Sequence, residues 1–170
     1  MKLRTIMIFP RITNIDIIEK IREQFDPLYK LVNPHITIVF PFDDDMSNEE
    51  LRTLLEKHLR SIQPFNIELK GFSMQEDKHG NYLFLNVIEG AETIKKIHDL
   101  LYLELFGEVK FDPEYVPHIT VGKLESKVMM HEAYNTVKDI DTKFSTLVDK
   151  IAVEMIGKNE ESIIIIEKSL

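Results

Sequence analysis

Cysteine is absent from the 170-residue chain. This excludes disulfide bonds and thiolate metal sites and favours an intracellular, cytoplasmic protein. No apolar run approaches the length of a membrane-spanning helix, so we expect no membrane partner. The first residues, MKLRTIMIFP, hold one short apolar run that Pro10 and Arg11 close. Such a run is typical of a first strand and not of a signal peptide.

Basic charge is also scarce, with 21 Lys and Arg against 29 Asp and Glu and a net charge of −8. Long nucleic-acid grooves are lined by clustered Lys and Arg, because these residues contact the phosphates. We therefore expect no such groove, although a small local site could hold a nucleotide or an RNA end. The length and the 44% share of apolar residues predict a single domain over residues 1–170, and we expect a monomer.

What the sequence does contain is the segment PHIT, twice, at residues 34–37 and 117–120. Each copy opens a short apolar run that is typical of a strand. Side chains i and i+2 of a strand share a face, so the histidine and the threonine of each copy point the same way, about 7 Å apart. Each strand would thus present a proton-transfer group beside a hydroxyl. The four side chains are His35, Thr37, His118 and Thr120.

Hydrophobic periodicity and turn signals predict alternating strands and helices around the two motifs. The expected strands cover residues 3–9, 35–40, 65–74, 81–88, 116–122, 144–156 and 162–168. The expected helices cover residues 14–25, 92–106 and 126–138, together with a helix that Ser47 and Glu50 cap and that extends to Ile62. The acidic run at residues 43–45 is expected to be a solvated loop before that helix, with a cation site as the alternative.

The order of these elements indicates an internal duplication, because each half reads helix, PHIT strand, helix, hairpin. The two histidines are 83 residues apart, and a D-P-x-Y sequence precedes each motif, at residues 26–29 and 112–115. We therefore expect two lobes, built from roughly 1–88 and 89–170, that pack face to face about a pseudo-twofold axis. The two PHIT strands would then meet in one central cleft.

Two histidine–hydroxyl pairs provide what phosphodiester cleavage without a metal ion requires. A base must activate the nucleophile and an acid must protonate the leaving oxygen. Histidine suits both roles, because its ordinary pKa is about 6.5. One imidazole must begin neutral and the other protonated, which predicts a bell-shaped pH–rate curve. The threonine hydroxyls would donate to the non-bridging phosphate oxygens, which gain charge in the transition state.

Two H-x-T motifs half a chain apart in a duplicated frame resemble the 2H phosphoesterase superfamily, which includes 2′-5′ RNA ligase-like proteins and RNA 2′,3′-cyclic phosphodiesterases. The Phe9-Pro10 end of the first strand and the D-P-x-Y runs resemble its small bacterial phosphoesterase branch. The resemblance covers essentially the whole chain. It implies an α+β, bilobal, pseudo-twofold fold, with antiparallel sheets lining a central cleft and helices outside. It implies no cofactor, and a substrate that is a nucleotide or RNA end with a cyclic or 2′-5′ phosphodiester.

The resemblance also implies roles for the four motif residues. His35 would be the proton donor, His118 the proton acceptor, and the two threonines the phosphate ligands. Many family members carry a basic residue after the second motif, which here is Lys123. Strand parity places it on the face opposite His118 unless the strand ends or bends at Gly122. Gly122 itself is expected on the cleft face, where the first motif has Val39.

Three further residues are candidates for substrate binding. Arg11 follows the first strand and could contact a phosphate, although a surface charge is the alternative. Phe42 and Tyr115 flank the motifs and could stack on a base, although core packing is the default explanation.

Two other functions stay open. The first is 2′-5′ RNA ligation, which is the reverse reaction; on long RNA it would need a basic collar that the net charge disfavours. The second is a non-catalytic module that binds a nucleotide or an RNA end. The sequence does not separate this module from the hydrolase.

Overall fold

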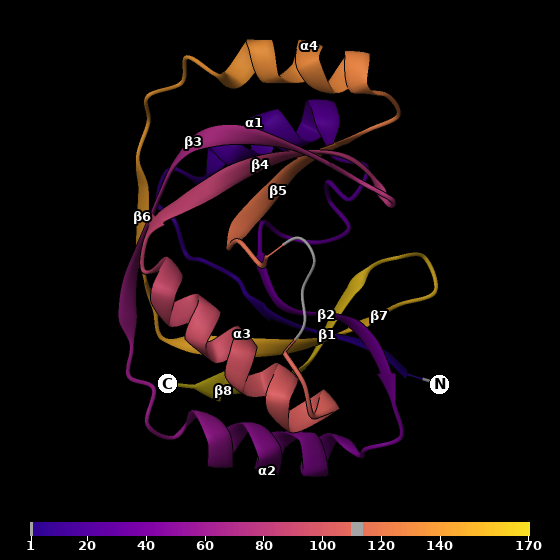
Figure 1. Ribbon diagram of the computed structural model, residues 1–170, viewed down its shortest axis with the longest axis vertical. Coiled ribbons are helices and arrows are strands. Elements are labelled where there is room, and N and C mark those ends of the chain that lie inside the picture. Colours follow the sequence, from indigo (N-terminus) through magenta and orange to yellow (C-terminus); the bar gives the residue numbers. More distant parts are fainter. Residues whose placement is uncertain (1, 110–113) are drawn as a thin grey trace.

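The computed structural model describes residues 2–109 and 114–170, which form four helices and eight strands (Figure 1). The strands form two four-stranded antiparallel sheets, sheet A with the order β2-β1-β7-β8 and sheet B with the order β5-β4-β3-β6. The strands are β1 Lys2–Ile8, β2 Ile36–Asp44, β3 Phe65–Asp77, β4 Gly80–Glu89, β5 His118–Leu124, β6 Phe144–Val148, β7 Lys150–Ile156 and β8 Ser162–Ser169. The helices are α1 Ile15–Phe25, α2 Asn48–Leu59, α3 Ala91–Phe106 and α4 Lys127–Val137.

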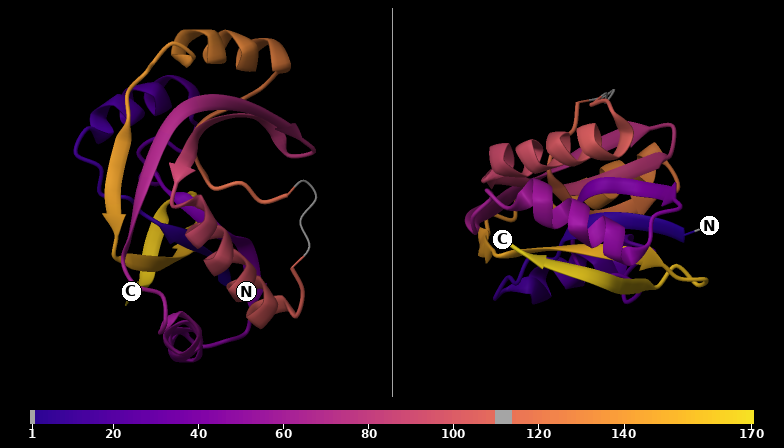
Figure 2. Two further views of the ribbon diagram at one scale, coloured as in Figure 1. Left: turned by 60° about the vertical axis from the view of Figure 1, so that its left-hand side comes forward. Right: turned by 90° about the horizontal axis from the view of Figure 1, so that it is seen from below.

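The helices pack against the two sheets. Helices α1 and α4 contact sheet B, α2 contacts sheet A, and α3 contacts β2 of sheet A and, less extensively, β4 of sheet B. Figures 1 and 2 show α4 at one end of the molecule and α2 at the other, with both sheets between them. The expected α+β architecture with antiparallel sheets is therefore present.

The sheets do not follow the expected lobe boundary near residue 88. Each sheet takes two strands from residues 1–88 and two from 89–170, because the β3–β4 hairpin leaves β1 and β2 and joins β5 and β6. The repeated unit is strand, helix, PHIT strand: β1-α1-β2 in the first copy and β4-α3-β5 in the second. In each unit the PHIT strand pairs antiparallel with the strand that opens the unit. The second copy thus begins at Gly80.

The strand expected over residues 144–156 is two strands, because the chain crosses between the sheets at Asp149. Its first part, β6, pairs with β3 in sheet B. Its second part, β7, pairs with β1 in sheet A. The crossing explains how the last two strands of the chain reach the sheet that contains its first strand.

The first PHIT strand is longer than expected and continues through Pro41 to Asp44. Proline is tolerated there because β2 is an edge strand, where a missing N–H leaves no ladder bond unmade. The following helix has the expected capping box: the Ser47 hydroxyl accepts from the Glu50 amide, and the Glu50 carboxylate accepts from the Ser47 amide at 2.7 Å.

Of the second D-P-x-Y run, Asp112 and Pro113 lie outside the described residues. Among the described helices, none combines the length and the apolar character that crossing a membrane demands.

Candidate active site

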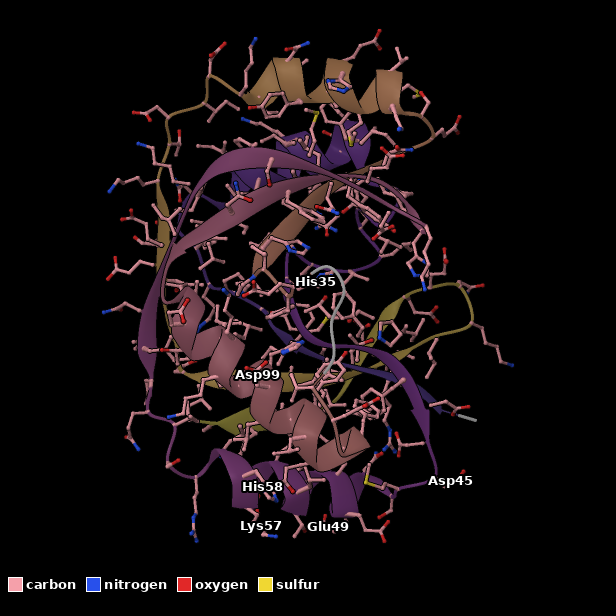
Figure 3. All side chains as sticks on the ribbon, viewed as in Figure 1. His35, Asp45, Glu49, Lys57, His58 and Asp99 are labelled. Atoms are coloured by element: carbon pink, nitrogen blue, oxygen red, sulfur yellow. The ribbon has the colours of Figure 1, made fainter. Side chains whose placement is uncertain are left out.

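Both PHIT segments lie where the two sheets approach each other. β2 is the edge strand of sheet A, β5 is the edge strand of sheet B, and the two strands are in contact. His35 precedes the first residue of β2, near the middle of the molecule (Figure 3). The histidine and threonine of each motif are half-buried, whereas Ile36 and Ile119 are completely buried. This is the alternation that the strand period predicts.

The two imidazoles are held by the same device. Nδ1 of His35 lies 2.8 Å from the carbonyl oxygen of Asn33, and Nδ1 of His118 lies 2.7 Å from that of Val116. A carbonyl can only accept, so Nδ1 must carry the hydrogen in both rings. Nε2 of each ring is therefore the atom that can gain or lose a proton, as acid–base catalysis requires.

A β-bulge follows the threonine in both motif strands. On β2, Thr37 pairs with Met7 and the next pair is Val39 with Ile6, so β2 has one extra residue. The same shift occurs on β5, where Val121 is the extra residue. There Thr120 pairs with Phe84, and Gly122 pairs with Leu83. One inserted residue turns every later side chain of the strand to the opposite face of the sheet.

The bulge brings Lys123 to the face of the candidate site. Lys123 pairs with Tyr82, which shares a strand face with Phe84. Phe84 in turn pairs with Thr120, so Lys123 and His118 lie on the same side of the sheet. The bulge is the irregularity near Gly122 that the parity argument left open. The Lys123 ammonium lies 5.6 Å from the centroid of the Tyr82 ring.

The same bulge turns Gly122 away from the cleft. A Cβ atom on Gly122 would lie 2.9 Å from the Cβ of Phe25 in α1. The expectation that Gly122 lies on the cleft face is thus wrong, because the missing side chain instead lets α1 approach β5. Val39, at the same place in the first motif, is completely buried.

An aromatic ring contacts each histidine, and sequence reasoning missed both. Phe84 stacks on His118 with 3.5 Å between ring centroids and 20° between ring planes. Phe9 lies 5.9 Å from His35 at 54°. The alternation of Tyr82 and Phe84 on β4 predicts that these rings share a face. The sequence does not tell that β4 pairs with β5, and that pairing places the face beside His118.

Burial lowers the pKa of both histidines. The pKa of His118 falls to about 4, first because its imidazolium would lose hydration and further because His35 repels it, while the Val116 carbonyl opposes the shift. Burial also lowers the pKa of His35. The Asn33 carbonyl and Asp26 act in the other direction, and Arg22 adds to the lowering.

Arg22 of α1 organises the turn that leads to His35. Its guanidinium is 1% exposed and makes a 2.7 Å ion pair with Asp26. It also donates to the carbonyl of Val32 at 2.7 Å, three residues before His35. Further partners are Glu19 and the carbonyl of Leu28. The sequence gives one indication of this cluster, because an arginine at a buried helix position needs partners.

The remaining candidates are not presented to a ligand as expected. Arg11 pairs with Asp149 between β6 and β7, neither of which neighbours a PHIT strand. Phe42 is buried with its ring edge against Phe106. Tyr115 is buried and donates its hydroxyl to the carbonyl of Thr37 at 2.7 Å. Core packing explains Phe42, and a cross-strand hydrogen bond explains Tyr115.

The side chain of Asp44 in the acidic run pairs with an arginine. Asp44 pairs at 2.8 Å with Arg4, which is completely buried and also bonds to the start of α2. Across residues 2–109 and 114–170, no group of three or more His, Asp or Glu side chains is arranged to hold a metal ion.

Comparison with known proteins now assigns the family. The model of the 2′-5′ RNA ligase superfamily matches residues 9–159. The chain belongs to this superfamily. A Geobacillus kaustophilus protein named "putative phosphoesterase" is 32% identical over 150 residues, covering 85% of this chain and 83% of that one. An RNA 2′,3′-cyclic phosphodiesterase of Thermotoga maritima is 27% identical over 111 residues, covering 64% and 58%.

Two solved structures share the fold of this chain. TT0787 of Thermus thermophilus superposes with a TM-score of 0.62 at 16% identity, covering 99% of this chain and 97% of that one. Escherichia coli LigT, solved with 3′-AMP, superposes with a TM-score of 0.58 at 15% identity, covering 99% and 98%. These matches confirm the 2H phosphoesterase fold that the paired motifs predict.

Proposed function

We propose that this protein is a phosphoesterase that opens a cyclic or 2′-5′ phosphodiester of a nucleotide or RNA end, without a metal ion. The observation that carries the proposal is the matched pair of imidazoles. Nδ1 of each imidazole donates a hydrogen bond to the backbone carbonyl two residues earlier in the chain. Each histidine is accompanied by a threonine on an edge strand, and the two edge strands are in contact. That arrangement leaves two Nε2 atoms, one for each proton transfer.

The difference in surroundings suggests which histidine does what. His118, with a pKa of about 4, is neutral at pH 7 and can take a proton from the attacking water. His35 would deliver the proton from its Nε2 to the leaving oxygen. Its pKa is lowered without substrate, but an anionic phosphate between the rings would raise it, because a neighbouring negative charge favours the imidazolium. Thr37 and Thr120 would donate to the non-bridging oxygens.

Names of relatives support this class of substrate. One relative is an RNA 2′,3′-cyclic phosphodiesterase, and a structural neighbour was solved with 3′-AMP. Lys123, which the bulge brings to the site's face, supplies a positive charge for the phosphate or for a base that stacks on it.

The test is hydrolysis in the presence of EDTA. Substrates would be 2′,3′-cyclic nucleotides, a 2′-5′ dinucleotide and ADP-ribose cyclic phosphate. We expect cleavage of at least one, a bell-shaped pH dependence, and loss of activity when His35 and His118 are both changed to alanine. The exposed His131 of α4 provides a matched control, since His131→Ala should leave the rate unchanged. Loss of activity in EDTA, or survival of activity in the double variant, would contradict the mechanism.

Ligation is the alternative that the superfamily name favours. The same acid and base serve both directions, so the structure would need no other catalytic groups. The net charge of −8 disfavours a long RNA substrate. Incubation of RNA halves that carry the matching ends, followed by sequencing of any 2′-5′ junction, distinguishes the two directions.

A further inference from the structure

Three aromatic side chains behind the site form a packed cluster, which we call the aromatic clasp: His98 and Tyr102 of α3, and Tyr115 just before β5. The His98 and Tyr115 rings are stacked, with centroids 3.9 Å apart and planes within 6°. The Tyr102 ring lies 4.5 Å from that of His98. His98 is 1% exposed and Tyr115 is 7% exposed, so the clasp is part of the protein interior.

The clasp holds the strand of the first motif. β2 is an edge strand, so one side of its backbone is not paired within the sheet. Two of its backbone groups bond to the tyrosines of the clasp. The Tyr115 hydroxyl donates to the carbonyl of Thr37 at 2.7 Å, and the Phe40 amide donates to the Tyr102 hydroxyl at 3.2 Å.

Tyr115 is also next to the residue that holds the second histidine. The carbonyl of Val116 accepts the Nδ1 hydrogen of His118 at 2.7 Å. The segment 115–116 therefore grips Thr37 of one motif with a side chain and His118 of the other with a carbonyl. Burial raises the pKa of Tyr115, so its phenol stays a neutral donor across the pH range of any assay.

We propose that Tyr115 is a positioning residue, which fixes Thr37 relative to His118 across the two motifs. The inference rests on the proposed function, because it concerns the reaction at the same site. The hydroxyl of Thr37 can stabilise the transition state only if its backbone stands at the correct distance from the phosphate that His118 serves. A displacement of about 1 Å can cost about 100-fold in rate.

The test is Tyr115→Phe, which keeps the ring and its stacking on His98 and removes only the hydroxyl. We expect kcat to fall about 10- to 100-fold while KM changes much less. Tyr29→Phe is the matched control, because Tyr29 precedes the first motif in a similar D-P-x-Y sequence and should leave kcat unchanged. An unchanged kcat in Tyr115→Phe would overturn the proposal.

A second measurement separates positioning from general loosening. In a Thr37→Ala background, Tyr115→Phe should lower kcat by less than about threefold, because the group that it positions is already gone. The same loss in both backgrounds would overturn the proposal. Tyr102→Phe should have a smaller effect than Tyr115→Phe, because Phe40 lies beyond the motif. An equal loss in these two variants would indicate a loosened strand and would also overturn it.

Phosphate binding distinguishes failure of this inference from failure of the proposed function. Inorganic phosphate titrated into the wild-type protein should shift the NMR signals of Thr37 and Thr120. In Tyr115→Phe we expect several-fold weaker binding with the Thr37 shift reduced most. If no substrate is cleaved but this weakening occurs, the proposed function fails and the positioning role stands. If substrate is cleaved and the weakening is absent, the positioning role fails.

Discussion

In the first half of the chain, the third turn of α1 contains Arg22; at the corresponding position, α3 contains His98. Buried isoleucines precede both at the same spacings, Ile18 and Ile21 in one helix and Ile94 and Ile97 in the other. Arg22 donates to the carbonyl of Val32, and His98 stacks on Tyr115. Val32 and Tyr115 each lie three residues before a motif histidine. Both halves thus brace the same point of the chain, one with charge and hydrogen bonds and one with stacked rings.

The difference in chemistry affects the two histidines unequally. His35 is near an ion pair, whose arginine lowers its pKa and whose aspartate raises it. His118 has a phenylalanine ring on one face, and within residues 2–109 and 114–170 the charged group that shifts its pKa is His35. The supporting residues therefore occupy corresponding positions in the two halves, with divergent chemistry. Such divergence is what an acid and a base with separate tasks require.

If the two motifs act as one catalytic unit, changing either histidine should cost as much as changing both. We expect His35→Ala and His118→Ala each to lower kcat by about 1,000-fold, in line with the loss of general acid or base catalysis. The double variant should lose little more, because one proton transfer without the other is ineffective. Steady-state kinetics on the best substrate would measure this. Losses that multiply in the double variant would show that the halves work independently.

Arg22→Met tests the charged brace of the first half. The change leaves the Asp26 carboxylate, whose side chain is only 5% exposed, without its cation. We expect a loss of about 3 kcal/mol in the free energy of unfolding, measured by urea denaturation. Arg11→Met is the control, since that arginine is 65% exposed and should cost less than about 1 kcal/mol. Similar losses in both variants would contradict the importance of the brace.

Gly122→Val places in the second motif the residue that the first motif has at position 39. The new side chain would meet the Cβ of Phe25 at 2.9 Å, so the end of α1 would have to move. We expect a loss of about 2 kcal/mol, and a smaller loss for Gly122→Ala. Thermal denaturation of both variants would measure it. An unchanged melting temperature would show that the two halves tolerate the same helix–strand distance.

The smallest effect concerns the charge that one histidine exerts on the other. By NMR titration we expect His118 to have a pKa near 4, and His35→Ala should raise it because a repelling charge is removed. The folded pKa lies below the unfolded value of about 6.5, so the unfolded chain takes up the proton first as pH falls. The free energy of unfolding should therefore decline between pH 6.5 and 4, and less steeply in His118→Phe. A pKa that does not respond to His35→Ala would contradict proximity of the two rings.

Local patterns were sufficient to predict most of the helices and strands and the alternation of side chains in the two motifs. The strand period places His35 with Thr37 and His118 with Thr120, and the Ser47–Glu50 capping box marks the start of α2, because these features depend on residues a few positions apart. The paired motifs also indicated the family and its fold.

What could not be predicted depends on strand pairing between distant segments. The bulges after Thr37 and Thr120 are visible only in the register with β1 and β4, and they decide where Lys123 and Gly122 point. At the crossing, the charged pair Asp149-Lys150 interrupts the apolar pattern, but nothing local shows that the two parts join different sheets. Tyr115 was noticed for its place before the motif, but its partner, the carbonyl of Thr37, is 78 residues away.

The order of the strands along the chain has a consequence for folding during synthesis, because the β3–β4 hairpin belongs to sheet B and not to the sheet that contains β1 and β2. All strands of sheet B lie between residues 65 and 148, whereas sheet A joins strands from residues 2–44 to strands from residues 150–169. As the polypeptide leaves the ribosome, sheet B can form while β1 and β2 are still an isolated two-stranded ribbon. Such a ribbon is only marginally stable by itself. On this order His118 can reach its final setting before His35, and sheet A can close only when residues 150–169 emerge.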